Sequence, residues 1–219
     1  MLKNVRIWFK KDGATRYISH LDLNRVMTRA LQHSRLPIWH TEGFNPHPFI
    51  TFALPLSLGF RGVKEAMDVR LLEDIPFNEV VSKLNNCLPN GIEIYKVTEP
   101  VMKSGKIALA KFDMKLTSDD VPLENLFQMF RDLFNLDKIE IEKRTKKGSK
   151  MIDLKPEIGA YTLEKLEDFV QLVITLPAGS VNNVNPSLLI TALENINNIS
   201  VYSDITRLDV YDENGKSFA

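Results

Sequence analysis

The side chains best suited to chemistry are the histidines, and all four lie within the first 50 of the chain's 219 residues. His20, His40 and His47, together with Asp22 or Glu42, are residue types that bind zinc or a non-haem metal. Their spacing matches no compact motif, and the single cysteine excludes a disulfide within the chain, a multi-thiolate zinc site and a chain-supplied iron–sulfur cluster. We therefore predict no cofactor and no metal, and keep the three histidines as the candidates for a metal site.

A metal-free alternative uses a histidine as an acid–base catalyst. A near-neutral imidazole beside Arg16, Tyr17 or Arg25 could cleave RNA by activating the RNA's own 2′-hydroxyl. His20 and His47 are the candidates for this reaction. The chain has no Walker, Gly-x-Gly-x-x-Gly or Gly-x-Ser-x-Gly motif, so nucleotide binding by a recognised motif and a serine hydrolase are not supported.

Positive charge is concentrated in the first third of the chain. Residues 1–70 contain 11 basic and 5 acidic side chains, a net charge of +6, although the whole chain has a net charge of zero. This asymmetry is expected either from chance clustering or from a face that meets an anion such as the RNA backbone. The candidate RNA-contacting side chains are Arg16, Arg25 and Arg29, with Tyr17 for stacking, and a second cluster of Lys143, Arg144, Lys146, Lys147 and Lys150. The plainer interpretation of the second cluster is a solvated hairpin tip.

An unusual loop precedes an apolar segment in the sequence TEGFNPHPFITFALPLSLG, residues 41–59. Its glycine and prolines break helix and strand, whereas FITFALPL is apolar and β-prone. We predict a stiff loop whose prolines lower the entropy lost when it binds RNA or a protein partner. The side chains that it would present are Glu42, Phe44, Asn45 and His47. The plainer alternative is that His47 only packs between two prolines.

The elements that must position these side chains follow from the hydrophobic pattern. Val5, Ile7 and Phe9 alternate with polar residues and predict a strand at 4–13, and Ser19 with Asp22 marks the start of a helix at 19–35. The second strand is expected at 36–42 and continues after the loop at 49–56, and a third strand is expected at 65–74. A helix at 76–89 and a fourth strand at 91–97 follow. This β-α-β-β-α-β order is the ferredoxin-like plan.

The same order is expected again after a linker at 98–108. The pattern predicts a strand at 111–117, a helix at 122–135, a hairpin-like pair at 138–154, a strand at 168–177, a helix at 185–197 and a last strand at 203–215. We therefore predict an α+β protein of two tandem ferredoxin-like units with mainly antiparallel sheets. The expected domains are 1–100, with the His-containing loop, and 101–219, with the basic hairpin tip.

Several segments resemble an uncharacterised bacterial family whose members occur beside, or fused to, radical SAM iron–sulfur proteins. The resemblance covers nearly the whole chain and is most specific in YISHLDLNRVMTRAL, LPIWHTEGFNPHPFITFALPLSLGF and EAMDVRL. The family pattern maps onto Ser19, His20, Asp22, Glu42, Gly43, Asn45, Pro46, His47 and Pro48. The resemblance implies a radical SAM protein as partner and a role near RNA modification, RNA processing or ribosome maturation. This chain lacks the three-cysteine cluster motif, so it cannot itself be the radical SAM enzyme.

These observations lead to one hypothesis and two alternatives. We expect a non-catalytic partner of a radical SAM enzyme. This partner would bind RNA or present a substrate to the enzyme. The alternatives are an RNA-cleaving or metal-dependent enzyme built on the N-terminal histidines, and a module that binds only protein. The sequence contains no apolar run long enough to span a bilayer, and with one cysteine we expect a cytoplasmic protein.

Overall fold

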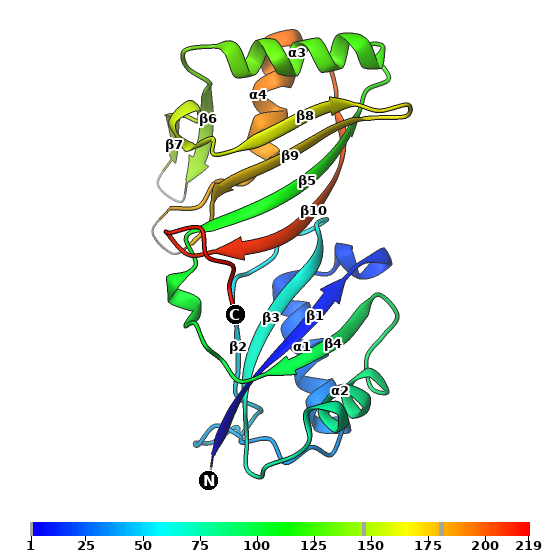
Figure 1. Cartoon of the computed structure of the whole chain (residues 1–219), viewed down its shortest axis with the longest axis vertical. Helices are drawn as coiled ribbons and strands as arrows, with labels where there is room; N and C mark the ends of the chain where they lie inside the picture. The colour runs from blue at the N-terminus through cyan, green and yellow to red at the C-terminus, as the bar shows by residue number, and fades with distance from the viewer. Residues whose placement is uncertain (1, 146–147, 180–181) are drawn as a thin grey trace. The chain divides into compact units, whose positions relative to one another are not determined.

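A computed structural model describes residues 2–145, 148–179 and 182–219 of the chain. It has mixed α+β structure with mainly antiparallel pairing and, in the described ranges, four α-helices (Figure 1), as the α+β prediction requires. The chain divides into two compact units, Met1–Ile107 with Arg207–Ala219, and Ala108–Thr206. No helix within the described ranges is long and apolar enough to cross a membrane.

The first unit contains a four-stranded antiparallel arrangement. Its strands have the order β4-β1-β3, and β2 pairs with the other edge of β3. The elements are β1 (Lys3–Lys11), α1 (His20–His33), β2 (Ile50–Phe52), β3 (Arg61–Leu71), α2 (Phe77–Asn85) and β4 (Ile92–Thr98), with short 3-10 turns at Gly13–Tyr17 and Ser104–Lys106.

Both parts of the strand expected before β3 are shorter than the hydrophobic pattern indicates. The segment at 36–42 forms no regular strand and pairs with the end of β3 through the bridge between Ile38 and Leu71 and a hydrogen bond from the Trp39 N–H to the Arg70 carbonyl. The segment at 49–56 forms only the three residues of β2. Prolines at 37, 48 and 55 explain the difference, because proline has no N–H to donate to a ladder.

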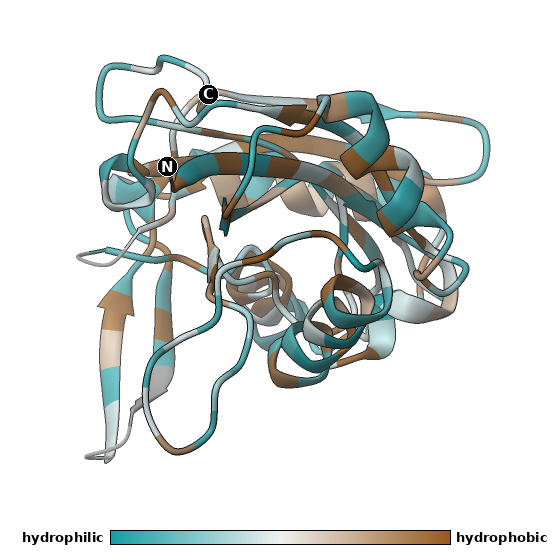
Figure 2. Cartoon of the chain, turned by 90° about the horizontal axis from the view of Figure 1, so that it is seen from below, coloured by the Kyte–Doolittle hydropathy of each residue, from teal (hydrophilic) through white to brown (hydrophobic). Residues whose placement is uncertain are grey.

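Helices α1 and α2 cover one face of this sheet (Figure 1). The Ser19 hydroxyl accepts a hydrogen bond from the Asp22 N–H at 3.1 Å, which fixes the start of α1. The helices carry both hydrophobic and hydrophilic stretches (Figure 2), as helices with one buried side should. The core between sheet and helices includes Val5, Ile7, Phe9, Leu23, Met27, Leu31, Met67, Val69, Val80 and Leu84.

The opposite face of the sheet carries polar side chains, because successive strand residues point to opposite faces. On β1 these are Asn4 and Arg6, which alternate with the core residues. On β3 they are Asp68 and Arg70. The register places Asn4 directly opposite Arg70 and Arg6 directly opposite Asp68, so four polar side chains lie together on the two central strands.

The second unit repeats the element order with one addition. Its strand order is β10-β5-β9-β8, and the hairpin β6–β7 forms a separate two-stranded sheet. The elements are β5 (Leu109–Thr117), α3 (Leu123–Asn135), β6 (Glu140–Thr145), β7 (Gly148–Asp153), β8 (Tyr161–Lys165), β9 (Val170–Pro177), α4 (Ser187–Asn197) and β10 (Tyr202–Tyr211). The hairpin was expected, but β8 was not.

The division of the chain differs from the expected domains 1–100 and 101–219. Residues 101–107 and 207–219 group with the first unit, so β10 belongs to the second unit only up to Thr206. Hydrogen bonds explain part of this grouping, because the Ala219 carbonyl accepts from the N–H groups of Val101 and Met102, at 3.3 and 2.7 Å, and from Arg6 at 2.5 Å. The pairing of these distant segments depends on three-dimensional contacts that hydrophobic periodicity does not encode.

Candidate functional site

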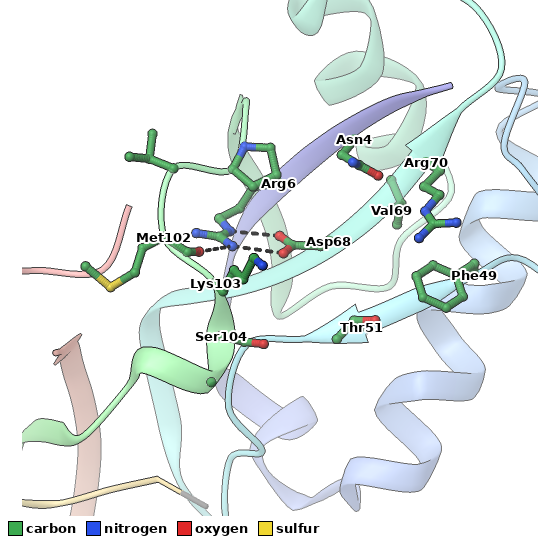
Figure 3. A pocket seen from close by; sticks show the side chains of 13 residues that line it. Asn4, Arg6, Phe49, Thr51, Asp68, Val69, Arg70, Met102, Lys103 and Ser104 are labelled. Atoms are coloured by element: carbon green, nitrogen blue, oxygen red, sulfur yellow. Dashed lines mark hydrogen bonds and ion pairs between the residues drawn. The ribbon is translucent and has the colours of Figure 1, made fainter. Parts of the chain in front are cut away.

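The first unit contains a pocket of about 690 Å³ on the polar face of its sheet (Figure 3). Three stretches of chain form it: the start of β1, the region from Phe49 through β3, and the connection after β4. The lining residues are Asn4, Arg6, Phe49, Thr51, Asp68, Val69, Arg70, Pro100, Val101, Met102, Lys103, Ser104 and Gly105. A volume of this size lies in the range of small-molecule sites.

One wall of the pocket is held by an ion pair between the buried Arg6 and the partly exposed Asp68. The Nε–Oδ1 and Nη2–Oδ2 distances are both 2.8 Å. Arg6 is fully buried, donates also to the carbonyls of Met102 and Ala219, and stacks over Phe218 at 4.0 Å from the ring centroid. Because these contacts occupy its guanidinium, we assign Arg6 to holding the pocket wall rather than to binding a ligand.

Arg70 lies against two aromatic rings at the other side of the pocket. Its guanidinium carbon is 5.0 Å from the Trp39 ring centroid and 4.7 Å from that of Phe49, and the two rings meet edge to face at 5.6 Å. Within the described residues, neither Arg70 nor Lys103 forms an ion pair. The pocket therefore contains two cations whose charge no carboxylate of the described chain neutralises.

The loop at 41–48 starts and ends at the rim of this pocket. Its base is closed by a bridge between His40 and Pro48 and by a hydrogen bond of 3.2 Å from the Phe49 N–H to the Trp39 carbonyl. Within the loop, the Thr41 N–H donates to the His47 carbonyl at 2.9 Å. The loop thus connects directly to the segments that carry Trp39 and Phe49, the two rings that contact Arg70. Its base therefore lies beside the pocket.

The predicted loop side chains Glu42, Phe44, Asn45 and His47 are all exposed. Phe44 is completely exposed, at 106% of its reference area. His47 Nδ1 lies 2.9 Å from the Asn45 carbonyl oxygen and 3.2 Å from the Thr41 hydroxyl. The imidazole therefore has local partners that shape the loop, while the Phe44 ring is presented to solvent.

The three candidate metal-binding histidines have separate surroundings. His20 begins α1 and meets the Phe52 ring at 4.9 Å, whereas His40 Nδ1 is 3.0 Å from the Ile38 carbonyl oxygen. Burial, assisted by the nearby charges of Lys11 and Arg207 and opposed by Glu65, lowers the pKa of His20. Among the residues that the structure describes, no group of three or more His, Cys, Asp or Glu side chains could hold a metal ion.

The basic residues predicted near α1 do not line the pocket. Arg16 Nε donates to the Gly59 carbonyl at 2.8 Å, and its guanidinium lies 5.1 Å from the ring of the exposed Tyr17. Arg25 pairs with Asp22 at 2.9 Å, and Arg29 is exposed on the same helix. None of the four predicted residues is among those that line the pocket, so any contact they make with a ligand is separate from it.

The second basic cluster lies on the β6–β7 hairpin. The backbone register pairs Lys143 with Lys150, and Lys150 is exposed. Lys146 and Lys147 lie outside the described residues, and so do the side chains of Lys143 and Arg144. Asp153 stabilises the base of the hairpin, since its carboxylate accepts from the N–H groups of Ile139 and Lys155, both at 2.9 Å, and these bonds lower its pKa.

Five pocket residues were not predicted from the sequence, namely Asn4, Phe49, Thr51, Arg70 and Lys103. A partial signal exists for Asn4, because it alternates with the core residues of β1 and must therefore point away from them. The position of Lys103 has no such signal. It depends on how the connection after β4 is held by Arg6.

Comparison with known proteins places the chain among bacterial sequences. The profile of a family described as "Uncharacterized protein conserved in bacteria (DUF2344)" matches residues 4–186. No curated protein matches the chain.

Two solved structures resemble it weakly. A crystal structure of a Cbf5-Nop10-Gar1 complex matches 84% of this chain at 10% identity with a TM-score of 0.41, and the chain spans 52% of that one. A crystal structure of an unknown protein from Galdieria sulphuraria matches 94% of this chain, and 99% of its own, at 12% identity with a TM-score of 0.27. At such TM-scores these similarities do not identify a function.

Proposed function

The chain belongs to the bacterial family of uncharacterised proteins DUF2344, and we propose that it is a non-catalytic protein that binds single-stranded RNA on the polar sheet face of its first unit. The observation that supports this most is the pair of uncompensated cations, Arg70 and Lys103, in a pocket flanked by Phe49 and Trp39. Cations attract backbone phosphates, and aromatic or guanidinium planes stack on unpaired bases.

We also propose that each of the two units has the ferredoxin-like fold. The support for this assignment is the strand order, β4-β1-β3-β2 in the first unit and β10-β5-β9-β8 in the second. In both, the fourth strand of the β-α-β-β-α-β series lies beside the first, and the third lies between the first and the second. The β6–β7 hairpin is then an insertion between the first helix and the second strand of the second unit.

Further RNA contacts are proposed outside the pocket. Arg16, Tyr17, Arg25 and Arg29 would follow the RNA backbone, and the basic hairpin would hold a second stretch of phosphates. Such surface cations raise affinity for any RNA sequence, whereas the pocket would favour one bound nucleotide over others. This division of labour makes the two kinds of contact separable by mutation.

RNA binding is tested with fluorescent single-stranded and structured RNA across a salt series. We expect micromolar or tighter binding whose logarithm falls steeply with the logarithm of salt concentration. Replacing Lys143, Arg144, Lys146 and Lys147 by alanine should flatten the slope by about 0.7 for each phosphate that the variant no longer neutralises. The matched control replaces Lys106, exposed and outside the pocket, by alanine. No binding at low salt would overturn the proposal.

The proposed partner is a radical SAM iron–sulfur protein to which the chain presents RNA for modification, processing or ribosome maturation. This part rests on the family resemblance, and the exposed Phe44 at the pocket rim is the surface that we assign to the partner. Co-purification of the two proteins should survive nuclease treatment and weaken in a Phe44→Ala variant.

The exposed ring also favours a second candidate, a module that binds only protein. Co-purification that resists nuclease, combined with no RNA binding at low salt, would support that candidate instead. Loss of co-purification on nuclease treatment would mean that RNA bridges the two proteins.

A further inference from the structure

The charges around the pocket leave a net positive site. Four charged side chains line it, and two of them, Arg6 and Asp68, neutralise each other in their ion pair. Arg70 and Lys103 remain, at opposite sides of the pocket in Figure 3. A ligand that spans the pocket and carries negative charge would meet both, as a phosphate monoester with an attached organic group does.

The aromatic side of the pocket suits a planar group. Phe49 lines the pocket directly, and the Arg70 guanidinium lies between the rings of Phe49 and Trp39. A nucleobase can stack on aromatic faces and on guanidinium planes, which is a common mode of binding unpaired bases. A phosphorylated sugar alone has no planar group to stack against this side of the pocket.

Polar side chains without protein partners complete the lining. Asn4, Thr51 and Ser104 line the pocket, and within the described chain none of their side chains makes a hydrogen bond to another residue. Asn4 lies directly opposite Arg70 across β1 and β3. Its amide offers one acceptor and two donors next to the stacking side, which suits the edge of a base.

Another polar cluster on the first unit has its hydrogen-bonding groups already paired with one another. Lys64 Nζ contacts an Asp209 oxygen at 2.9 Å and the Ser217 hydroxyl at 2.5 Å, and that hydroxyl donates to Asp209 at 2.8 Å. These three side chains satisfy one another. The pocket at Arg70 is therefore the better-supported ligand site.

We propose that this pocket binds one nucleoside monophosphate unit, with the base against Phe49 and Arg70 and the phosphate toward Lys103. The unit is supplied either by a free nucleotide or by an unpaired nucleotide of RNA. The inference deepens the proposed function and rests on it only for the RNA source. It adds a defined ligand class and a defined set of contacts.

The test is calorimetric titration of the full chain with the four nucleoside 5′-monophosphates, the four nucleosides and inorganic phosphate. At least one monophosphate should bind roughly tenfold more tightly than its nucleoside and than phosphate, since it alone engages both sides of the pocket. Lys103→Ala should weaken binding of the monophosphate roughly tenfold and leave that of the nucleoside unchanged. Asn4→Ala should reduce the preference between bases, because its amide faces the base edge.

Arg70 is tested with two variants. Arg70→Lys keeps the charge and removes the stacking plane, so it should weaken binding of the nucleoside as much as that of the monophosphate. Arg70→Ala should weaken binding of the monophosphate further. Arg131→Ala is the matched control, because Arg131 also lies over an aromatic ring, Phe127 at 5.9 Å, but in the second unit. If Arg70→Ala unfolds, the exposed Lys103 and Asn4 variants still decide the question.

The outcomes separate this inference from the proposed function. RNA binding without any monophosphate binding, or monophosphate binding that Lys103→Ala and Asn4→Ala leave unchanged, overturns the inference and leaves the function standing. Monophosphate binding that those variants weaken, without RNA binding, supports the inference with a free nucleotide as ligand and overturns the RNA function. No binding of either ligand overturns both.

Discussion

Arg6 and Asp68 occupy directly paired positions on β1 and β3, and two contacts of 2.8 Å join their side chains. The same guanidinium donates to the carbonyls of Met102 and Ala219. The buried Arg6 side chain therefore joins the two central strands β1 and β3. It also connects them to the segment after β4 and to Ala219. The pocket wall formed by that segment is held by this cation and by the hydrogen bonds from Val101 and Met102 to the Ala219 carbonyl.

The first prediction concerns the removal of this cation. Arg6→Met should destabilise the chain by about 1–3 kcal/mol, because the part-buried Asp68 then loses its partner and the Met102 carbonyl loses the guanidinium as donor. Urea unfolding of the full chain measures the change. The double variant Arg6→Met with Asp68→Leu should recover part of the stability, because no carboxylate then remains unpaired at this position. Equal stability of wild type and Arg6→Met would show that the pair is not structural.

A second prediction concerns Gly62, which lies beneath a buried side chain. A Cβ atom at this position would overlap Cγ and Oε1 of Glu65. Glu65 cannot move away freely, because it is buried and pairs with Arg207 through contacts of 2.5 and 3.0 Å. Gly62→Ala should therefore cost about 1–3 kcal/mol of unfolding free energy.

The matched control for this substitution is Gly105→Ala, because a Cβ at Gly105 meets no atom within 4 Å. Its unfolding free energy should stay within about 0.5 kcal/mol of the wild-type value. The same urea titration serves both variants. Equal effects at the two positions would contradict the crowding that we assign to Gly62.

The elements of the first unit that the sequence predicted best are those with strong local signals. The start of α1 follows from Ser19 and Asp22, and its buried side from Leu23, Met27 and Leu31 at helical spacing. β1 follows from the alternation of Val5, Ile7 and Phe9. Local signals sufficed here because capping and periodicity act within a few residues.

Other elements depend on distant contacts and lacked such signals. β8 (Tyr161–Lys165) is short and mostly exposed, and only Tyr161 and Leu163 form its apolar side, which is too brief a pattern to predict a strand. It becomes a strand because β9 offers it a partner edge. The pocket is a stronger case, since Arg70 and Lys103 are 33 positions apart in the sequence but line the same pocket. The connection that carries Lys103 is held there partly by the bond from Arg6 to the Met102 carbonyl. Attention to histidines therefore indicated the loop at the rim but missed the pocket.

The third prediction separates structural from binding roles in the loop. The double variant Asn45→Ala with His47→Ala should fold, with a stability change within about 0.5 kcal/mol, because both side chains are exposed. Binding of RNA or of the radical SAM partner should weaken. Thermal unfolding and fluorescence titration measure the two effects. Exposed His33, replaced by alanine, controls for the loss of an imidazole. Unfolding of the double variant would instead assign the loop a structural role.

The last prediction follows from the lowered pKa of His20. Burial is the main cause, Lys11 and Arg207 add to it, and Glu65 opposes it, so the folded chain favours the neutral imidazole. The unfolded chain then binds more protons below the ordinary pKa of 6.5. The stability contribution of this residue is therefore complete above pH 6.5 and is lost as the pH falls below that value.

Urea unfolding at a series of pH values between about 8 and 5 measures this loss. His20→Gln should show a flatter decline in unfolding free energy below pH 6.5 than the wild type, since glutamine takes up no proton. His33→Gln provides the reference for removing an exposed histidine from the same helix. Parallel curves for wild type and His20→Gln would contradict the assignment of the acid sensitivity to His20.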